Sequence, residues 1–474
     1  MRACPSLVRV DVLIPQTRGQ NLLGQAYGQA PTLFDGVRHP SQSCRIFVRT
    51  RHKSSAVDRR AGGFHHGGST PTPRQGTIME NACGNLGIMG AAAPDAATLA
   101  AVAGAAMHGA AQAVLSVRAA RIEMPTPNMT TGGLWRVQRT AALAAGDGNT
   151  ADSRTKPFSV VAKLIQSPLL WHGIGQVPPG MREELASQYL WRTEAEIYAS
   201  RLAEVVPGGG RLPDVLGLCD VDPQRTVIWM EDVQEHPDAS WSDEVFAQAA
   251  HWLGRLAGSR AVRANWPQFD EEGAAGKLRF YVHGVGAHVL VPSLLGEDLW
   301  RLPSVAPAAT PDLVAGLRAL AVRAGDIVEE MLAMPQLPSH GDACPQNLVI
   351  ESGRDGPAQF VAIDWGLAGP ACPGFDLSQL LAGHANDGRL PAEAVHRLEP
   401  QCLGSYCEGL AQSGSHVDKS AVRRGHALSL ALFTGLFTLV TPRLEEPDSP
   451  ELHAFMAQRL AMGRFALDLL AETD

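Results

Sequence analysis

The sequence predicts an α+β protein of two lobes, a small β-rich lobe followed by a larger, mainly helical lobe. Short β-branched and alternating apolar segments lie before Val233, and long segments of helical periodicity follow it. A change of charge near residue 78 separates both lobes from the start of the chain. We therefore expect an extension over 1–78, an N-lobe over 79–233 and a helical C-lobe over 234–474.

The extension is basic, whereas the rest of the chain is acidic. Residues 1–78 contain only three acids, Asp11, Asp35 and Asp58, although the net charge of the whole chain is −8. No hydrophobic period is sustained here, which is typical of a disordered arm. A transit peptide or a nucleic-acid contact would also be basic, but no amphipathic helix or aromatic interleaving supports either. We expect a chain begun at Met79 to fold.

Composition bounds the class of protein. With 474 residues, 45% of them hydrophobic, the chain can bury a sizeable core. Its eight cysteines include no C-x-x-C pair, which argues against a zinc framework and a secreted disulfide scaffold and favours the cytoplasm. The longest apolar run, Ala427–Val440, is shorter than the roughly 20 residues that span a bilayer, so we expect a buried helix and no membrane partner.

Local patterns predict the elements of both lobes. In the N-lobe we expect a helix over Asp95–Arg121, a hairpin of strands near Leu134–Leu143 and Phe158–Ile165 joined by a turn over 145–153, a helix over Met181–Leu202 and a strand over Thr226–Met230. In the C-lobe we expect a helix over Ser240–Val262 and two helices that begin at Thr310-Pro311 and Ser449-Pro450. Between the last two, residues 347–351 and 359–364 form a hairpin around a Gly/Pro turn.

Three polar residues around this hairpin suggest a magnesium–phosphate site. Asn347 opens the first strand and Asp364 closes the second, so antiparallel pairing places them ~5 Å apart, close enough to share a hard cation. Asp342, on the preceding loop, would lie beside the metal and can orient an attacking hydroxyl or accept its proton. Turn chemistry alone also favours Asn and Asp at hairpin ends, so each residue is a weak signal by itself.

The ordered set His340-Gly341-Asp342, Asn347 and Ile363-Asp364-Trp365 resembles the aminoglycoside phosphotransferase and choline kinase superfamily. The resemblance implies a protein-kinase-like two-lobed fold, ATP and Mg²⁺ as cofactors, and a small-molecule hydroxyl as acceptor. It implies Asp342 as the catalytic aspartate and Asn347 and Asp364 as metal ligands. It also implies Asp376 as a structural aspartate and His340 as a scaffold for the loop.

The upstream half of a kinase is also indicated. Lys163 ends Val160-Val161-Ala162-Lys163, a strand on which a lysine can neutralise phosphates, as in the Val-Ala-Ile-Lys pattern of protein kinases. A solitary strand lysine is usually a solvated charge, but Glu194 or Glu196 on the next helix could pair with it. The family pattern favours Glu194, which lies before the apolar pair Ile197-Tyr198.

Two further segments are assigned by position. Gly132 and Gly133 lie upstream of Lys163, where a phosphate-covering loop is expected, although a plain hairpin turn explains them equally well. Met230 and Asp232 lie in a segment that resembles the hinge between kinase lobes, whose backbone receives adenine; its acids are also explained as structural. Together these four residues complete the predicted nucleotide contacts.

The substrate class follows from departures from protein kinases. Gly341 replaces the arginine of His-Arg-Asp, and the short segment between Asp364 and Asp376 leaves no room for a peptide-binding activation segment. We therefore expect a small-molecule kinase whose acceptor is an amino sugar, aminoglycoside, macrolide or small alcohol, bounded by segments 240–334 and beyond Pro391. A catalytically inactive nucleotide-binding module and an unusual protein or lipid kinase are the alternatives.

Overall fold

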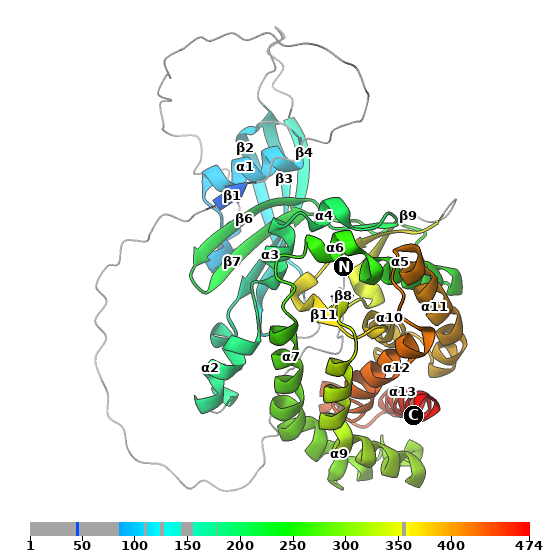
Figure 1. Ribbon diagram of the computed structural model, residues 1–474. Coiled ribbons are helices and arrows are strands. Elements are labelled where there is room, and N and C mark those ends of the chain that lie inside the picture. Colours follow the sequence, from blue (N-terminus) through cyan, green and yellow to red (C-terminus); the bar gives the residue numbers. More distant parts are fainter. Residues whose placement is uncertain are drawn as a thin grey trace, which may run out of the picture.

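The computed structural model describes residues 44–46, 85–108, 111–123, 128–143, 155–177, 179–352 and 357–474. Its two parts are the predicted ones, a β-rich N-lobe and a mainly helical C-lobe (Figure 1). The predicted α+β class is confirmed.

The N-lobe is built on an antiparallel sheet of six strands in the order β1-β6-β7-β4-β3-β2. The strands are β1 (Cys44–Ile46), β2 (Ala111–Arg121), β3 (Thr131–Leu143), β4 (Thr155–Gln166), β6 (Val215–Asp222) and β7 (Arg225–Glu231). The predicted hairpin is formed by β3 and β4, and its predicted turn over 145–153 lies outside the described residues. The predicted strand over Thr226–Met230 is β7, which pairs with β4.

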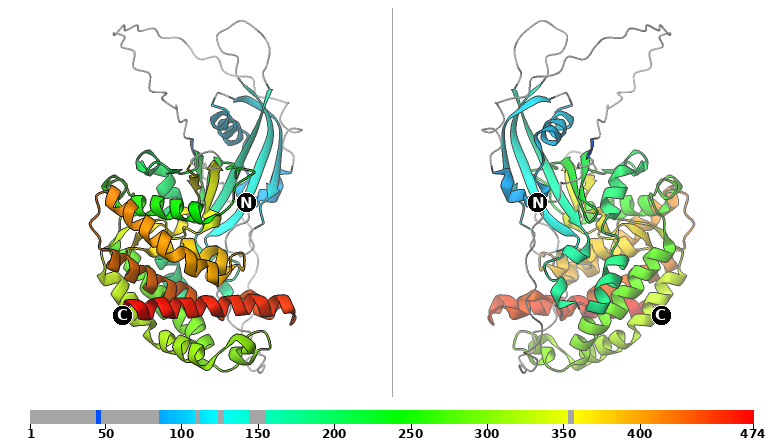
Figure 2. Two further views of the ribbon diagram at one scale, coloured as in Figure 1. Left: turned by 90° about the vertical axis from the view of Figure 1, so that its right-hand side faces the viewer. Right: turned by 90° about the vertical axis from the view of Figure 1, so that its left-hand side faces the viewer.

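Alternation along β4 gives the sheet two buried faces. Val160, Ala162 and Leu164 face a core formed with the short helix η1 (Leu86–Ala92) and α1 (Ala96–Ala106), which cover one side of the sheet (Figure 2). Val161 and Ile165 face the main core, on the side of the C-lobe. Lys163 lies between these two in sequence, so the period of two aims its side chain toward the C-lobe.

Three sequence expectations for the N-lobe are wrong in part. Only 96–106 of the expected helix over Asp95–Arg121 is helical, because its second half pairs with β3 as β2. The expected helix over Met181–Leu202 is broken into α2 (Pro179–Gln188), α3 (Thr193–Ala199) and α4 (Leu202–Val205). Cys44–Ile46, inside the expected disordered arm, pairs with β6 as an edge strand, while the rest of 1–78 lies outside the described residues.

Two C-lobe helices begin at the predicted caps Thr310 and Ser449, and the helix expected from Ser240 begins three residues later, after the cap Ser242. Side-chain oxygens of Ser242, Thr310 and Ser449 accept hydrogen bonds from the first turns of α5 (Asp243–Gly258), α9 (Pro311–Ala333) and α13 (Pro450–Thr473). The expected helix over Ser240–Val262 ends with α5, and a short α6 (Arg260–Ala264) follows. The remaining larger elements are α7 (Glu271–Phe280), the π-helix η4 (Tyr281–Leu290), α8 (Val291–Leu295), α10 (Phe375–Asn386), α11 (Ala392–Gln412) and α12 (Lys419–Leu430).

The apolar run Ala427–Val440 is buried over most of its length, in α12 and the π-helix η9 (Ala431–Gly435). Within the described ranges, no single helix is long and apolar enough to cross a membrane. Only η1 and α1 together pass such a test of length and composition, and they meet at a 97° bend.

The predicted C-lobe hairpin is confirmed as β9 (Leu348–Ser352) and β10 (Gln359–Ala362). A short strand from the end of the N-lobe, β5 (Gly210–Arg211), pairs parallel with β10. The Arg211 guanidinium lies 2.7 Å from Glu231 of β7 and 2.6 Å from Glu351 of β9. One side chain thus joins a strand of the N-lobe to the β9–β10 hairpin of the C-lobe.

Candidate active site

A buried aspartate holds the loop that follows β8 (Leu337–Ser339). Asp376, in the first turn of α10, accepts hydrogen bonds from the Ser339 hydroxyl and from the backbone N–H groups of His340 and Gly341, at 2.8 to 2.9 Å. Burial raises the pKa of Asp376 to about 6, although all three hydrogen bonds oppose this rise. Asp376 therefore has the structural position that the family resemblance implies.

His340 links the loop to the end of β10. Its Nε2 lies 3.0 Å from the carbonyl oxygen of Ile363, and its Nδ1 accepts a hydrogen bond from the N–H of Asp342. Nε2 is therefore the protonated nitrogen, since a carbonyl can only accept. Burial lowers the pKa of His340 to about 4, so the ring is neutral near pH 7. His340 is placed as a scaffold and not as a base.

We expect His340 to make the protein less stable in acid. Its folded-state pKa of about 4 lies below the ordinary 6.5, so the unfolded chain binds more protons between these values and stability is lost as the pH falls through this window. At pH 5 the loss is about 2 kcal/mol relative to pH 7. Urea unfolding at both pH values should show a smaller drop for His340→Gln than for the wild type. Equal drops would contradict the assignment.

The backbone conformation at position 341 explains why the residue there is a glycine. Gly341 has φ +79°, a left-handed conformation that favours glycine. A Cβ there would lie 2.1 Å from the carbonyl oxygen of Leu367. The arginine that protein kinases carry at this position therefore does not fit this loop.

Lys163 forms ion pairs with one carboxylate from each lobe. Its Nζ lies 2.6 Å from Oε2 of Glu194 on α3 and 2.8 Å from Oδ1 of Asp364, which follows β10. Burial opposes the charge of Lys163, but the two carboxylates outweigh it and raise the lysine pKa. Burial raises the pKa of Glu194 against the effect of Lys163. The predicted choice of Glu194 over Glu196 as the partner of Lys163 is confirmed.

Asp342 and Asn347 form the second half of the site. The Asn347 amide donates from Nδ2 to the main-chain oxygen of Asp342 at 2.9 Å and to its carboxylate at 3.0 Å. The N–H of Ile363 donates to the carbonyl of Asn347, which continues the hairpin ladder up to Asp364. Asp364 itself has φ +62°, an uncommon value for a residue with a side chain. The hairpin thus brings Asn347 and Asp364 to adjacent strand ends, as predicted.

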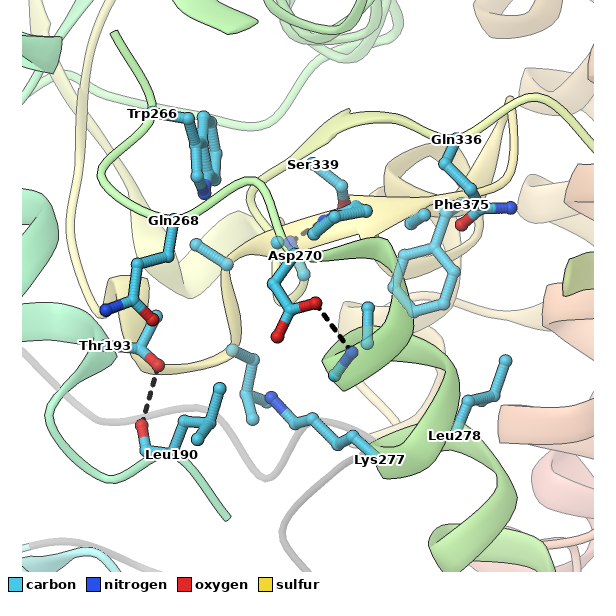
Figure 3. A pocket seen from close by; sticks show the side chains of 18 of the residues that line it. Leu190, Thr193, Trp266, Gln268, Asp270, Lys277, Leu278, Gln336, Ser339 and Phe375 are labelled. Atoms are coloured by element: carbon cyan, nitrogen blue, oxygen red, sulfur yellow. Dashed lines mark hydrogen bonds between the residues drawn. The ribbon is translucent and has the colours of Figure 1, made fainter. Parts of the chain in front are cut away.

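A cleft between the lobes contains most of these groups. Its volume is about 640 Å³, part of it open to solvent, and Lys163, Glu194, Asp342 and Asp364 line it together with residues 128–131 and 189–191. A second, larger pocket of about 1080 Å³, also partly open to solvent, lies beside it and is lined mostly by the C-lobe and partly by residues 190–197 of the N-lobe (Figure 3). Its walls are mainly apolar and include Trp266, Tyr281, Met331, Phe375 and Phe433. Just under half of the lining residues lie in the segments that we expected to bound the acceptor, and the others come from 190–197, 336–341 and 367–375.

Four predicted nucleotide contacts do not line either space. Gly132 and Gly133 belong to the start of β3, at an irregularity of the ladder, and not to the loop before it; a Cβ on Gly133 would meet the Trp135 ring at 2.2 Å. Their expected place in a loop is therefore wrong, and packing explains them. The Asp232 carboxylate is bonded to Arg136 and Ser159, as a structural acid would be. Met230 is buried in the main core.

The donor set fits a hard cation that is shared with phosphates. Both hydrogen bonds of the Asn347 amide use Nδ2, which leaves Oδ1 as an oxygen ligand beside the Asp364 carboxylate. Within the described ranges, no three His, Cys, Asp or Glu side chains are grouped as a metal site. A Mg²⁺ held by Asn347 and Asp364 would thus need further oxygens from phosphate and water, which is usual for Mg²⁺.

One residue of the site carries no sequence signal. Lys277 of α7 lines both the cleft and the pocket, yet it belongs to no motif and lies far from the other site residues in the sequence. Its place depends on how α7 packs against β11 (Gly369–Ala371) and α2, which no local pattern predicts.

Comparisons with known proteins give distant similarities. No family model and no curated protein matches the chain. Among solved structures, an amicoumacin kinase in complex with AMP-PNP and Ca²⁺ is 12% identical over 75% of this chain and 88% of its own, with a TM-score of 0.39. An aminoglycoside phosphotransferase of Alicyclobacillus acidocaldarius is 15% identical over 75% and 91%, also at 0.39. An ethanolamine kinase of Plasmodium vivax is 10% identical over 75% and 82%, at 0.38.

Proposed function

We propose that this chain is an ATP- and Mg²⁺-dependent phosphotransferase that transfers the γ-phosphate of ATP to a hydroxyl of a small molecule. The observation that carries the proposal is the pairing of Lys163 with both Glu194 and Asp364, next to Asp342 and Asn347, in one cleft between the lobes. These five side chains come from segments far apart in the sequence, and each has a role in phosphoryl transfer.

Some of these side chains would bind the nucleotide, and others would bind the acceptor. Lys163, held by Glu194, would bind phosphate oxygens once these displace Asp364 from its ammonium. Asn347 and Asp364 would hold Mg²⁺, which neutralises charge on the phosphates. Asp342 would orient the acceptor hydroxyl and accept its proton, while the neighbouring pocket would hold the rest of the acceptor.

The acceptor class follows from the walls of the pocket. Aromatic and aliphatic side chains form most of them, and the carboxylates that line it are Glu196 and Asp270. Asp270 is already used as the N-cap of α7, where it accepts from Gly273 at 2.9 Å. We therefore favour an acceptor with a substantial apolar body, such as a macrolide or an apolar alcohol, over a polycationic aminoglycoside.

An ATP-consumption screen tests this proposal. Purified protein should consume ATP in the presence of Mg²⁺ and at least one member of a panel of amino sugars, aminoglycosides, macrolides and small alcohols, and EDTA should stop the reaction. Calorimetry should show Mg²⁺-dependent ATP binding without any acceptor. Binding without turnover across the panel would favour the alternative, an inactive nucleotide-binding module. Absence of nucleotide binding would contradict both.

A further inference from the structure

Lys277 lies where the nucleotide cleft meets the apolar pocket. Of the residues that the structure describes, three line both spaces, Leu190, Lys277 and Leu367, and Lys277 is the charged one among them. Figure 3 shows its side chain extending from α7 across the pocket toward Leu190. If nucleotide and acceptor bind in the two neighbouring spaces, the transferred group must cross at this junction.

The ammonium of Lys277 has no counter-ion within the described part of the chain. Burial lowers its pKa to about 8, and no carboxylate acts on it strongly enough to oppose this shift. Lys163, by contrast, is paired with two carboxylates in the same cleft. A partly buried ammonium without a partner costs free energy, so a ligand anion at this junction would relieve that cost.

Four of the five acids that line the cleft or the pocket have other partners. Glu194 and Asp364 pair with Lys163, Asp342 is bonded to Asn347, and Asp270 caps its own helix. The elements packed against α7 also carry titratable groups: Arg182, Glu183 and Glu184 on α2, Tyr281, His283 and His288 on η4, and Asp312, Arg318, Arg323, Asp326, Glu329 and Glu330 on α9. Glu329 pairs with Arg279 of α7, and within the described residues none of these groups forms an ion pair with Lys277. The remaining acid of the pocket is Glu196 of α3.

We propose that Lys277 contacts the phosphoryl group during transfer and stabilises the negative charge on its outer oxygens. This inference rests on the proposed function. In the step concerned, the acceptor oxygen forms a bond to the γ-phosphorus while the bond from that phosphorus to the bridging oxygen of ADP breaks. The hydroxyl proton passes to Asp342, and a phosphate monoester and ADP leave. Lys277 takes no proton and acts through its charge.

The first test uses a mimic of the transferred group. Calorimetry would measure ADP binding with Mg²⁺ in the presence and absence of aluminium fluoride, which forms a planar phosphoryl analogue on ADP. We expect a gain in affinity of about 10²-fold or more for the wild type. Lys277→Met should lose about 10-fold or more of this gain and bind ADP alone normally. Lys277→Arg should keep it, as should Lys419→Met, a control on the exposed face of α12.

The second test measures the chemical reactivity of the Lys277 amine and does not depend on catalytic turnover. Acetic anhydride labelling near pH 8, quantified by mass spectrometry, should modify Lys277 readily, and AMP-PNP with Mg²⁺ should protect it by several-fold. If the wild type binds nucleotide but Lys277 stays unprotected, or if Lys277→Met keeps the full gain, this inference is wrong and the proposed function stands. If the wild type binds no nucleotide, both are wrong.

Discussion

Asp342→Asn is expected to lower turnover by a factor on the order of 10² or more while nucleotide binding persists. The substitution removes the proton acceptor but keeps the side-chain shape, and an amide oxygen can still accept the bond from Asn347. Steady-state phosphate transfer with the acceptor found in the screen, paired with calorimetric ATP titration, measures both effects.

A matched control for this change is Asp468→Asn, because Asp468 is an exposed residue of α13 that lines neither the cleft nor the pocket. It should behave like the wild type in both assays. Near wild-type turnover for folded Asp342→Asn would remove Asp342 from the reaction and leave the proposed function without its acid–base group.

Gly341→Ala is expected to cost roughly 3 kcal/mol or more of unfolding free energy and to abolish transfer. The left-handed backbone alone costs about 1–2 kcal/mol with a Cβ. Contact with the Leu367 carbonyl adds about 1–3 kcal/mol unless the loop moves, and movement would displace Asp342. Chemical denaturation gives the stability change, and the transfer assay gives the functional one.

Gly369→Ala serves as the control on the neighbouring strand β11. Nothing lies within 4 Å of a Cβ at Gly369, so its stability should stay within about 0.5 kcal/mol of the wild type. If Gly341→Ala were as well tolerated as Gly369→Ala, the loop would have to be looser than its hydrogen bonds to Asp376 indicate.

The parts of the molecule that the sequence predicts are those with strong local signals. Caps at Thr310 and Ser449 fix helix starts by backbone chemistry within one turn, and the β9–β10 hairpin follows from two short apolar runs around a turn. The hairpin then carries Asn347 and Asp364 to one place, so the core of the candidate site could be predicted with it.

What the sequence did not predict depends on distant partners. Residues 111–121 are Ala-rich and read as helix, but pairing with β3 makes them a strand. Gly132 and Gly133 look like loop glycines, yet the Trp135 ring and the β3–β4 ladder fix their role. Lys277 enters the site only because α7 packs beside the cleft.

The two ion pairs of Arg211 have a consequence for motion between the lobes. One guanidinium holds Glu231 of the N-lobe and Glu351 of the C-lobe, so rotation about an axis through Arg211 keeps both pairs, whereas rotation about a distant axis breaks at least one. Such a pivot would separate Lys163 from Asp364 while the Arg211 edge stays closed. For a nucleotide to enter, the cleft would then open most at the edge furthest from Arg211 and least beside Arg211.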